Sequence, residues 1–389
     1  MSEMSYLEKL LDGVKVEWLP LGEITKYEQP TKYLVKAKDY HDTYTIPVLT
    51  AGKTFILGYT NETHGIYQAS KTPVIIFDDF TTANKWVDFD FKAKSSAMKM
   101  VTSCDDNKTL LKYVYYWLNT LPSEFAEGDH KRQWISNYSQ KKIPIPCPGN
   151  PEKSLAIQAE IVRILDTFTA LTAELTTELT TELTMRKKQY NYYRDQLLSF
   201  KEGEVEWKML GDLGENLDSK RKPITSGLRE AGSIPYYGAS GIVDYVKDYI
   251  FDGDFLLISE DGANLLARNT PIAFSISGKS WVNNHAHVIK FDSYAERRYV
   301  EYYLNSIDLA PYISGAAQPK LNKKNLESIR IPNPSPEDKE RIVSILDKFD
   351  ALTNSINEGL PREIELRQKQ YEYYRDLLFS FPRPETASN

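Results

Sequence analysis

The sequence contains Ile161-Val-Arg-Ile-Leu-Asp-Thr-Phe-Thr-Ala-Leu-Thr172 and, later, its near-copy Ile342-Val-Ser-Ile-Leu-Asp-Lys-Phe-Asp-Ala-Leu-Thr353. Each of these is followed by a second matching segment, Gln189-Tyr-Asn-Tyr-Tyr-Arg-Asp-Gln-Leu-Leu-Ser-Phe200 and Gln370-Tyr-Glu-Tyr-Tyr-Arg-Asp-Leu-Leu-Phe-Ser-Phe381. Both matches are offset by 181 positions, since 342 − 161 and 370 − 189 are equal. Two blocks of equal length that repeat in this way indicate an internal duplication.

The spacing of apolar residues predicts that each block is a long amphipathic helix. A stripe with steps of three and four residues lies on one helix face, and such a stripe needs a partner to bury it. We predict that the two helices pair with each other as an antiparallel coiled coil. Two separate helices, each lying on its own domain, are the alternative. The predicted pairing residues are Ile161, Leu165, Phe168, Leu175, Leu179, Leu183, Ile342, Leu346 and Phe349.

The two helices differ in their middle. The first contains Thr172-Ala-Glu-Leu-Thr-Thr-Glu-Leu-Thr-Thr-Glu-Leu183, a four-residue unit written three times. Each unit adds about 6 Å to a helix, so this segment is interpreted as a spacer. The second contains Ile356-Asn-Glu-Gly-Leu-Pro361, where Gly359 and Pro361 predict a break or kink.

Length and composition limit the class of protein. A chain of 389 residues is long enough for two to four domains, and its formal charge is −6. Two cysteines, Cys104 and Cys147, and five scattered histidines predict neither a disulfide framework nor a zinc site. The N-terminal segment lacks the pattern of a signal peptide, and no apolar run reaches membrane-spanning length. We expect a cytoplasmic protein.

The duplication extends beyond the helices. Val16-Glu-Trp18 returns as Val205-Glu-Trp207, and the Pro-rich Ile143-Pro-Ile-Pro-Cys-Pro148 is echoed by Ile329-Arg-Ile-Pro-Asn-Pro334. The predicted fold class is α+β with a pseudo-twofold repeat, in which two tandem α/β globules are separated by the two long helices. The expected boundaries are 1–150 for the first globule, 151–201 for the first helix, 202–335 for the second globule, and 336–389 for the second helix and tail.

Local patterns inside the globules predict matching elements. The apolar runs Pro73–Phe77 and Phe255–Ser259 are typical of buried strands. The segments Leu110–Leu118 and Ala295–Leu304 look helical and occupy matching places. Ser335 is a predicted N-cap for the second long helix, with Pro336 at the first helical position.

Known catalytic motifs are missing from the sequence. The nearest approach to a phosphate-binding loop, Gly227-Leu-Arg-Glu-Ala-Gly232, lacks the required lysine, and dinucleotide, adenine-methyltransferase, metalloprotease and serine-hydrolase motifs are absent. The acid pairs Asp78-Asp79 and Glu260-Asp261 follow predicted strands, where turn and helix-cap roles are favoured over catalysis. We predict a protein that does no covalent chemistry. An enzyme with an unfamiliar site near Asp78 or Glu260 stays open as an alternative.

Basic loops stand out against the acidic background in both halves. Lysine and arginine neutralise phosphates, and arginine, glutamine and asparagine can also read base edges, so these loops predict contact with nucleic acid. The alternative for any single loop is a solvated polar surface, but its repetition favours function. The acidic total suggests that a partner subunit helps to hold the nucleic acid. The predicted DNA-binding residues in these loops are Lys131, Arg132, Gln133, Lys220, Arg221, Lys222, Gln318, Lys320, Asn322 and Lys323.

Four segments of the second half resemble a known family: Ile234-Pro-Tyr-Tyr-Gly-Ala-Ser-Gly-Ile-Val-Asp244, Leu257-Ile-Ser-Glu-Asp-Gly-Ala-Asn264, Asn283-Asn-His-Ala-His287 and Gly315-Ala-Ala-Gln-Pro-Lys-Leu-Asn322. They are similar to the DNA-specificity subunit of type I restriction-modification enzymes, and the two long helices resemble its conserved spacer regions. The resemblance covers essentially the whole chain and adds Asn264 to the expected DNA-binding residues. The first half departs from these motifs, with Phe77-Asp-Asp-Phe80 in place of the Glu-Asp-Gly-Ala-Asn signature.

The resemblance implies a division of labour. Each globule would be a target recognition domain that reads one half of a bipartite, asymmetric site on double-stranded DNA. The helices would set the gap between the half-sites and dock two modification subunits, which methylate adenine with S-adenosylmethionine. Translocation and cleavage, with ATP and Mg²⁺, would belong to separate restriction subunits, so this chain would be non-catalytic and hold no cofactor or metal. Besides the enzyme with an unfamiliar site, a structural adaptor that binds only proteins stays open as an alternative.

Overall fold

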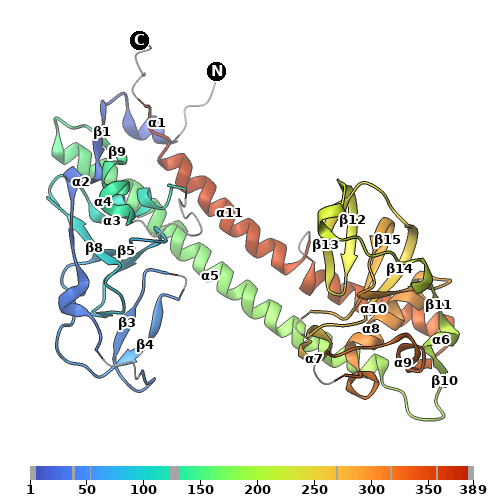
Figure 1. Ribbon diagram of the computed structural model, residues 1–389. Helices are drawn as coiled ribbons and strands as arrows, with labels where there is room; N and C mark the ends of the chain where they lie inside the picture. The colour runs from blue at the N-terminus through green and yellow to red at the C-terminus, as the bar shows by residue number, and fades with distance from the viewer. Residues whose placement is uncertain are drawn as a thin grey trace. The chain divides into compact units, whose positions relative to one another are not determined.

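The computed structural model describes residues 6–36, 40–52, 54–122, 132–268, 270–315, 318–355 and 358–383. The chain divides into two compact units. Unit 1 comprises Met1–Glu178 with Ile364–Asn389, and unit 2 comprises Leu179–Glu363. Each unit therefore holds one globule, the start of the long helix that follows this globule, and the end of the other long helix (Figure 1).

Unit 1 is built around the buried strand β5 (Val74–Asp78), which lies in a sheet with the order β2-β8-β5-β6. Alternate residues of β5 point to opposite faces, so Ile75 and Phe77 enter one apolar core while Val74 and Ile76 enter another. A continuous apolar run is what such a strand requires, because both of its faces are covered. The remaining strands form the sheets β4-β3-β7 and β1-β9.

The other strands and helices of unit 1 are short. The strands are β1 (Val16–Pro20), β2 (Thr25–Glu28), β3 (Ile46–Leu49), β4 (Ile56–Thr60), β6 (Asn84–Val87), β7 (Lys92–Ala93), β8 (Met98–Ser103) and β9 (Lys142–Pro146). The helices are α1 (Tyr6–Leu11), α2 (Leu21–Ile24), α3 (Leu111–Leu118) and α4 (Gln133–Ser136), with 3₁₀ turns at Pro30–Tyr33 and Tyr138–Gln140.

Unit 2 repeats this plan around β14 (Phe251–Ser259), in a six-stranded sheet with the order β11-β16-β14-β15-β12-β13. Here Leu256 and Ile258 enter one core, and Phe255 and Leu257 enter the core on the opposite face. The segments that the duplication repeats at the start and end of each globule form strands that pair antiparallel, β1 with β9 and β10 with β17. The strand and helix predictions for the two globules are thus confirmed.

The globule of unit 2 has longer strands than that of unit 1. The strands besides β14 are β10 (Glu206–Met209), β11 (Glu215–Asn216), β12 (Ala231–Gly238), β13 (Gly241–Val246), β15 (Ala273–Val282), β16 (Ala286–Lys290) and β17 (Arg330–Asn333). The helices are α6 (Leu210–Leu213), α7 (Asn264–Ala267), α8 (Tyr294–Ser306) and α9 (Lys323–Glu327), with 3₁₀ turns at Asp218–Lys220, Ser226–Leu228 and Ala310–Tyr312.

The first long helix is continuous and the second is broken. The first is α5 (Pro151–Leu198), whereas the second consists of α10 (Pro336–Asn354) and α11 (Leu360–Leu378). Gly359 lies at the break with a φ of +81°, and a Cβ there would come within 2.4 Å of the carbonyl oxygen of Ala351. Only glycine fits this position, which confirms the predicted interruption and gives its cause.

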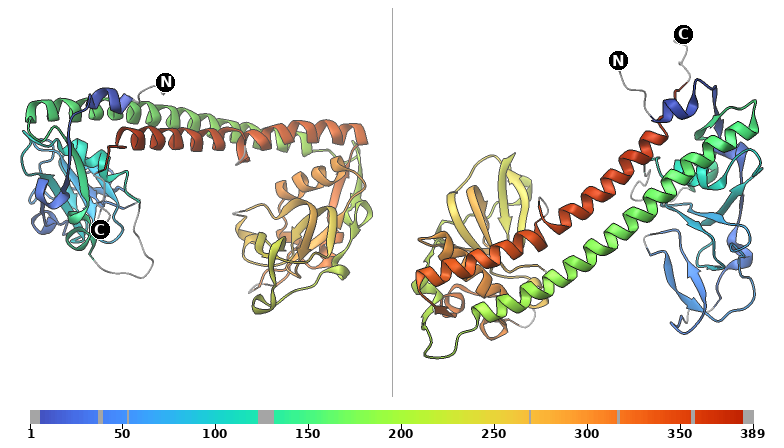
Figure 2. Two further views of the ribbon diagram at one scale, coloured as in Figure 1. Left: turned by 90° about the horizontal axis from the view of Figure 1, so that it is seen from above. Right: turned by 180° about the vertical axis from the view of Figure 1, so that it is seen from behind.

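Both units contain an antiparallel helix pair. In unit 1 the start of α5 lies beside the end of α11 (Figure 2). There Phe168 stacks on Tyr374. In unit 2 the end of α5 lies beside α10, where Phe349 contacts Tyr190 and Tyr193. The prediction that the long helices pack together is therefore confirmed.

The other predicted pairing residues lie in two kinds of place. The residues near the start of each long helix are buried in the core of the adjoining globule, together with residues from the end of the partner helix; these are Ile161, Leu165, Ile342 and Leu346. The residues of the spacer segment are half-buried on α5; these are Leu175, Leu179 and Leu183. The start of each long helix is thus buried on its own globule, as in the alternative, in a core that the end of the partner helix also enters.

Helix α3 fastens the globule of unit 1 to the long helix. Asp166 of α5 accepts a hydrogen bond of 2.5 Å from the Tyr116 hydroxyl and one of 2.9 Å from the Lys112 ammonium. Burial raises the pKa of Tyr116 well above its ordinary value, and the bond to Asp166 raises it further, so this hydroxyl stays protonated and remains a donor.

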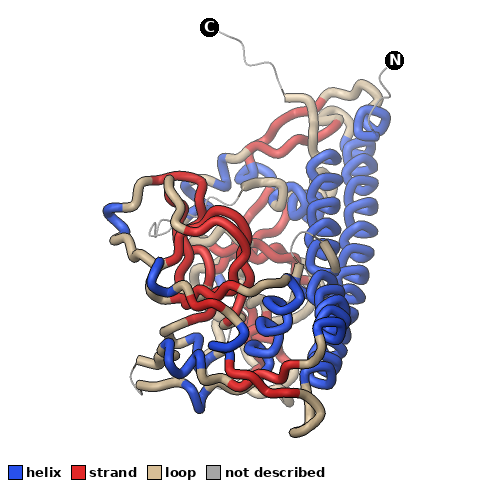
Figure 3. The backbone as a smooth tube through the Cα atoms, turned by 90° about the vertical axis from the view of Figure 1, so that its right-hand side faces the viewer, coloured by secondary structure: helices blue, strands red, loops and turns tan. Residues whose placement is uncertain are grey.

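Helix α8 fastens the globule of unit 2 to its long helix in the same way. Figure 3 shows the helices in blue and the strands of the globules in red. Asp347 of α10 accepts from the Tyr302 hydroxyl at 2.6 Å and from the Arg298 guanidinium at 3.0 Å. Asp166 and Asp347 are separated by the same 181 positions as the repeated blocks. The duplication has therefore preserved the contact between globule and helix.

Within the part of the chain that the structure describes, no helix is both long enough and apolar enough to cross a membrane.

Candidate nucleic-acid interface

In unit 2, a buried acid follows the central strand. Glu260 is 8% exposed; the Arg221 guanidinium donates to it at 2.6 Å, and the Lys320 ammonium lies 3.0 Å from its other oxygen. Burial raises the pKa of Glu260, but the bonds from Arg221 and Lys320 outweigh this effect and hold the pKa below its ordinary value. Glu260 is therefore a carboxylate that joins two basic segments lying far apart in the sequence.

A buried histidine lies beside this carboxylate. His287 of β16 is fully buried, with Nδ1 2.6 Å from the Asp218 carboxylate and Nε2 2.7 Å from the carbonyl oxygen of Leu321. Through these two contacts His287 ties the 318–322 loop and the 218–222 segment to the sheet.

Asp218 and His287 form a polar cluster with Glu260. Their ligand-type atoms lie within 4.8 Å of one another, a spacing that a metal ion could also use. However, Arg221 contacts both carboxylates, at 3.3 Å from Asp218 and 2.6 Å from Glu260. Burial raises the pKa of Asp218, and the bond to His287 leads the effects that bring it below the ordinary value. Cations of the protein thus already balance the acids, and the cluster fits an ion-pair network.

Unit 1 has a corresponding buried acid after its central strand. Asp79 is 1% exposed and lies 3.1 Å from the ammonium of the fully buried Lys99 on β8. Its other carboxylate oxygen accepts a hydrogen bond of 2.8 Å from the backbone N–H of Trp134. The guanidinium of Arg132 lies 3.9 Å from the oxygen that faces Lys99. Asp79 therefore adjoins the predicted basic loop of the first half.

The backbone of each acid also holds its loop. The carbonyl oxygen of Asp79 accepts from the N–H of Gln133 at 2.8 Å, and that of Glu260 accepts from the N–H of Leu321 at 2.8 Å. The turn role expected for the neighbouring Asp78 is confirmed, because its carboxylate accepts from the N–H groups of Phe80 and Thr81. The acids Asp79 and Glu260, by contrast, act as buried anchors, which the sequence pattern did not reveal.

Several predicted DNA-binding residues keep their charged ends at the surface. Arg132 and Lys320 are each 52% exposed although they contact buried acids. Lys323 lies 3.6 Å from Glu327 on α9 and is also exposed. The exposed basic residues of the predicted set are Arg132, Lys220, Lys222, Lys320 and Lys323. Lys131 lies outside the described residues.

Other predicted residues serve the loops themselves. Arg221 is 13% exposed and bonds to Glu260 and to the backbone. Asn264 exchanges two hydrogen bonds with the backbone of Thr270, and Asn322 caps α9 by accepting from the N–H of Asn325. The bonds of these side chains hold the backbone of the loops. The sequence motif alone does not show whether such a side chain bonds to its own loop or contacts DNA.

A hollow opens beside the second loop. It is lined by Asp261, His285 and the predicted Gln318, among others, and His285 Nδ1 lies 2.8 Å from the Asp261 carboxylate. A partly exposed carboxylate, an exposed imidazole and an exposed amide together offer the donors and acceptors that read base edges. Asp261 and His285 were absent from the predicted set, because nothing in the sequence indicates that residues 24 positions apart converge.

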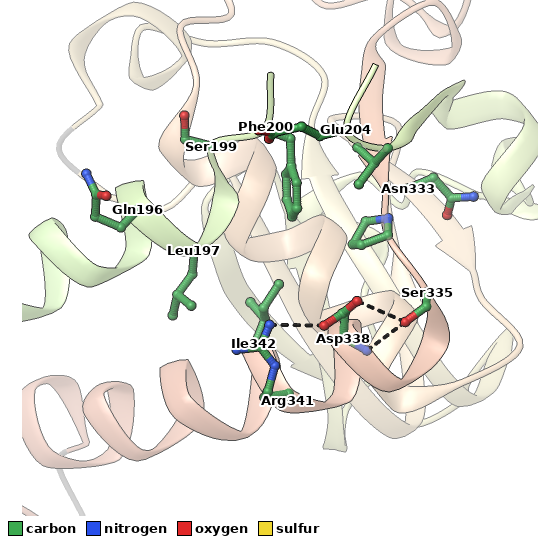
Figure 4. A pocket seen from close by; sticks show the side chains of 12 residues that line it. Gln196, Leu197, Ser199, Phe200, Glu204, Asn333, Ser335, Asp338, Arg341 and Ile342 are labelled. Atoms are coloured by element: carbon green, nitrogen blue, oxygen red, sulfur yellow. Dashed lines mark hydrogen bonds and ion pairs between the residues drawn. The ribbon is translucent and has the colours of Figure 1, made fainter. Parts of the chain in front are cut away.

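A second hollow lies where α5 ends and α10 begins (Figure 4). Ser335 accepts from the N–H of Asp338 at 3.1 Å, which confirms the predicted N-cap, and Arg341 donates to Asp338 at 3.0 Å. Leu197 and Phe200 supply its apolar side. Asp338 bonds both to Arg341 and to the cap residue Ser335, which is the pattern of a helix start.

Comparison with known proteins agrees with the duplicated architecture. The model of the type I restriction modification DNA specificity domain matches residues 14–185 and again 202–366. The chain is 67% identical to the specificity subunit of the Escherichia coli type I restriction enzymes EcoR124I/EcoR124II, over the full length of both. It is 38% identical to the specificity subunit of the E. coli enzyme EcoprrI, over 92% of this chain and 93% of that one.

Solved structures share the fold at low sequence identity. The S subunit of a type I restriction-modification system from M. genitalium gives a TM-score of 0.53 at 15% identity, covering 98% of this chain and all of that one. A chain from a structural study of the assembly and conformational transition of the type I system gives a TM-score of 0.58 at 15% identity, covering 94% of this chain and 97% of that one. These likenesses extend over nearly the whole chain.

Proposed function

Since this chain belongs to the type I restriction-modification DNA specificity family, in which it is the non-catalytic specificity subunit, we propose that each of its two globules reads one half of a bipartite, asymmetric site on double-stranded DNA. The proposed recognition domains are 1–150 and 202–335, and the proposed spacer helices are 151–201 and 336–389.

The proposal is supported by an arrangement of acid and basic loop that both units share, although the residues that form it differ. Each central strand ends at a buried acid whose carbonyl oxygen holds a loop, and a half-exposed cation projects from that loop. Exposed cations next to groups that read base edges are the requirement for combined phosphate and base contact. Because the loop residues differ between the halves, the two units are suited to different base sequences.

The proposal gives the long helices two tasks. As a spacer, α5 sets the gap between half-sites, with about 6 Å for each four-residue unit. As a docking surface, the helices bind two modification subunits through aromatic residues that the duplication repeats. Tyr192 and Tyr193 are 61% and 46% exposed, and their counterparts Tyr373 and Tyr374 are 65% and 36% exposed. Exposed aromatic pairs of this kind are typical of interfaces.

The remaining chemistry falls to partner subunits. In this proposal the modification subunits bind S-adenosylmethionine and methylate adenine, and the restriction subunits use ATP and Mg²⁺ for translocation and cleavage. The complex acts on DNA in the cytoplasm. The loops Arg132–Gln133, Lys220–Lys222 and Gln318–Lys323 contribute the contacts to DNA.

The experiment is a genome-wide map of adenine methylation in a host that expresses this chain with its modification subunit. The matched control is the same host lacking only this chain. We expect a two-part motif with a fixed gap that appears only when the chain is present. An unchanged map, despite a stable complex with the modification subunit, would contradict the proposal and favour the protein-binding adaptor.

A further inference from the structure

We propose that Asp79 and Glu260 are positioning residues for DNA recognition: each holds the basic loop of its own globule in the conformation that meets DNA, and neither contacts DNA itself. This inference rests on the proposed function. It assigns a role to two acids that lie beside surfaces expected to bind a polyanion.

The two acids occupy the same place in the two sheets. Asp79 is the first residue after β5, and Glu260 is the first residue after β14. In unit 1, Phe77 of β5 lies opposite Lys99 of the neighbouring strand β8. A cation on the neighbouring strand thus lies opposite the residue two positions before the acid.

Unit 2 has the same register. The corresponding strand partner is His287 of β16, which lies opposite Ile258 of β14. Its ring Nδ1 lies 3.9 Å from the Glu260 carboxylate, compared with 3.1 Å between Lys99 and Asp79. Both strand partners are fully buried. Each acid thus enters the interior beside a basic side chain that the sheet supplies, Lys99 in unit 1 and His287 in unit 2.

The loop completes the balance of charge on each acid. A carboxylate taken out of water is costly unless it is paired and hydrogen-bonded. Asp79 gains the N–H of Trp134 and the guanidinium of Arg132, whereas Glu260 gains the ammonium of Lys320 and the guanidinium of Arg221. Moving either loop away would leave the acid short of partners, so the loops are held in place.

The backbone fixes the loop more closely than the ion pairs do. The carbonyl oxygens of Asp79 and Glu260 accept from Gln133 and Leu321 at 2.8 Å each. In both loops the half-exposed cation is the residue immediately before this N–H, Arg132 in one and Lys320 in the other. Lys320 is therefore held at its base by the backbone and along its side by the carboxylate, whereas Arg132 is held at its base with its guanidinium 3.9 Å from the carboxylate. The charged end of each stays accessible.

Glu260 additionally positions a second basic segment. Arg221 bonds to it at 2.6 Å and to the carbonyl oxygen of Ala286 at 2.8 Å. The exposed Lys220 and Lys222 flank Arg221 in the chain. Asp79 has no such second partner among the described residues. We therefore expect the Glu260 variant to have the larger effect.

Electrostatics and positioning predict opposite results when an acid is neutralised. If charge alone mattered, Glu260→Gln or Asp79→Asn would strengthen all DNA binding, because it removes a negative charge near a polyanion. If the acid positions its loop, specific binding weakens, since the loop no longer meets the bases in register, whereas non-specific binding is kept or strengthened. The sign of the change separates the two.

The test uses the full complex of this chain with its modification subunits. Equilibrium binding is measured for the wild type, Glu260→Gln, Asp79→Asn and the control Asp252→Asn, an exposed acid at the opposite end of β14. Each is titrated with the specific duplex, with duplexes mismatched in one half-site or the other, and with unrelated DNA. Thermal unfolding of each complex is recorded in parallel.

We expect Glu260→Gln to weaken specific binding by about tenfold, the effect of one mismatched base pair, and to lose discrimination at one half-site only. Asp79→Asn should do the same at the other half-site, and Asp252→Asn should change neither. Replacing Lys320 with Met should cost less affinity in the Glu260→Gln background than in the wild type, because the cation is then already displaced.

Specific binding that is unchanged or tighter in both acid variants would overturn the inference, and so would equal loss at both half-sites. Failure of both variants to assemble would also overturn it, since the acids would then be determinants of the fold. If instead the wild type shows no two-part preference, it is the proposed function that fails. The wild-type titration thus distinguishes the two failures.

Discussion

Phe168 of α5 stacks on Tyr374 of α11 with ring planes 1° apart and centroids separated by 5.4 Å. The equivalent pair in the second copy, Phe349 of α10 and Tyr193 of α5, stacks at 27° and 5.8 Å. Each copy of the repeated block therefore supplies the phenylalanine to one unit and the tyrosine to the other. Each helix pair is thus made of two different parts of the duplicated sequence.

Replacing Phe349 with Ala should destabilise unit 2 by about 2 kcal/mol, less than a fully buried phenylalanine because this side chain is half-buried. Chemical denaturation of the full chain measures the change. The control is Tyr193→Phe, which keeps the stacked ring and should be nearly neutral. Equal stability of Phe349→Ala and the wild type would show that the stack contributes nothing.

Replacing Asp347 with Asn should destabilise unit 2 by about 1–3 kcal/mol, because Tyr302 and Arg298 lose a charged acceptor between the globule and α10. The control is Asp350→Asn, a 40% exposed acid that lies 3.4 Å from the same arginine and should matter little. In a double-mutant cycle with Tyr302→Phe, additive losses would argue against a shared interaction.

Deleting Thr176–Leu179 should shorten α5 by about 6 Å and reduce the gap between the two half-sites by one or two base pairs, since DNA rises about 3.4 Å per base pair. The methylation map of the deletion variant measures both the gap and the half-sites. Both half-site sequences should stay the same. A changed half-site would refute the spacer role.

Replacing Arg132, Lys320 or Lys323 with Ala should weaken DNA binding and lower the slope of log affinity against log salt by about 0.9 for each lost phosphate contact. The same result is expected from the sequence for Lys131. Arg221→Ala should act differently, lowering stability more than the salt slope, because its guanidinium bonds inside the protein. Lys348→Ala, on the exposed face of α10, is the control. Slopes that match the wild type for every loop variant would contradict direct phosphate contact.

The pKa values of Asp218 and Glu260 lie below their ordinary values in the folded chain. Groups with a depressed pKa stabilise the fold above the unfolded-state value, about 4, and this contribution is lost as pH falls through the folded-state value. Unit 2 should therefore lose stability below about pH 4, and Glu260→Gln should reduce this loss. Denaturation midpoints measured from about pH 3 to neutrality provide the test. An identical acid dependence in the variant would exclude Glu260 as a source.

Local patterns in the sequence were sufficient for the long helices and their break. The apolar stripe from Ile161 to Leu183 follows helical periodicity, and Gly359 needs a backbone conformation that other residues avoid. The strands β5 and β14 were also predictable, because a strand buried on both faces is a continuous run of apolar residues. Such features depend on neighbours in the chain, and the chain displays them directly.

The acid anchors required the tertiary structure. Asp79 and Lys99 are 20 positions apart, and Glu260 meets Arg221 39 positions before it and Lys320 60 positions after it. Only strand register and loop closure bring these charges together, and a single sequence carries no record of that register. For the same reason the sequence did not show that Arg221, a predicted DNA-binding residue, bonds to Glu260.

The sequence by itself determined the duplication, the two mixed globules, the helix that is continuous and the helix that is broken, because repetition and periodicity are properties of residue order. The tertiary structure alone decided which charges remain exposed and which are buried. That choice depends on the desolvation of each group and on the partners that distant strands supply, and residue order specifies neither.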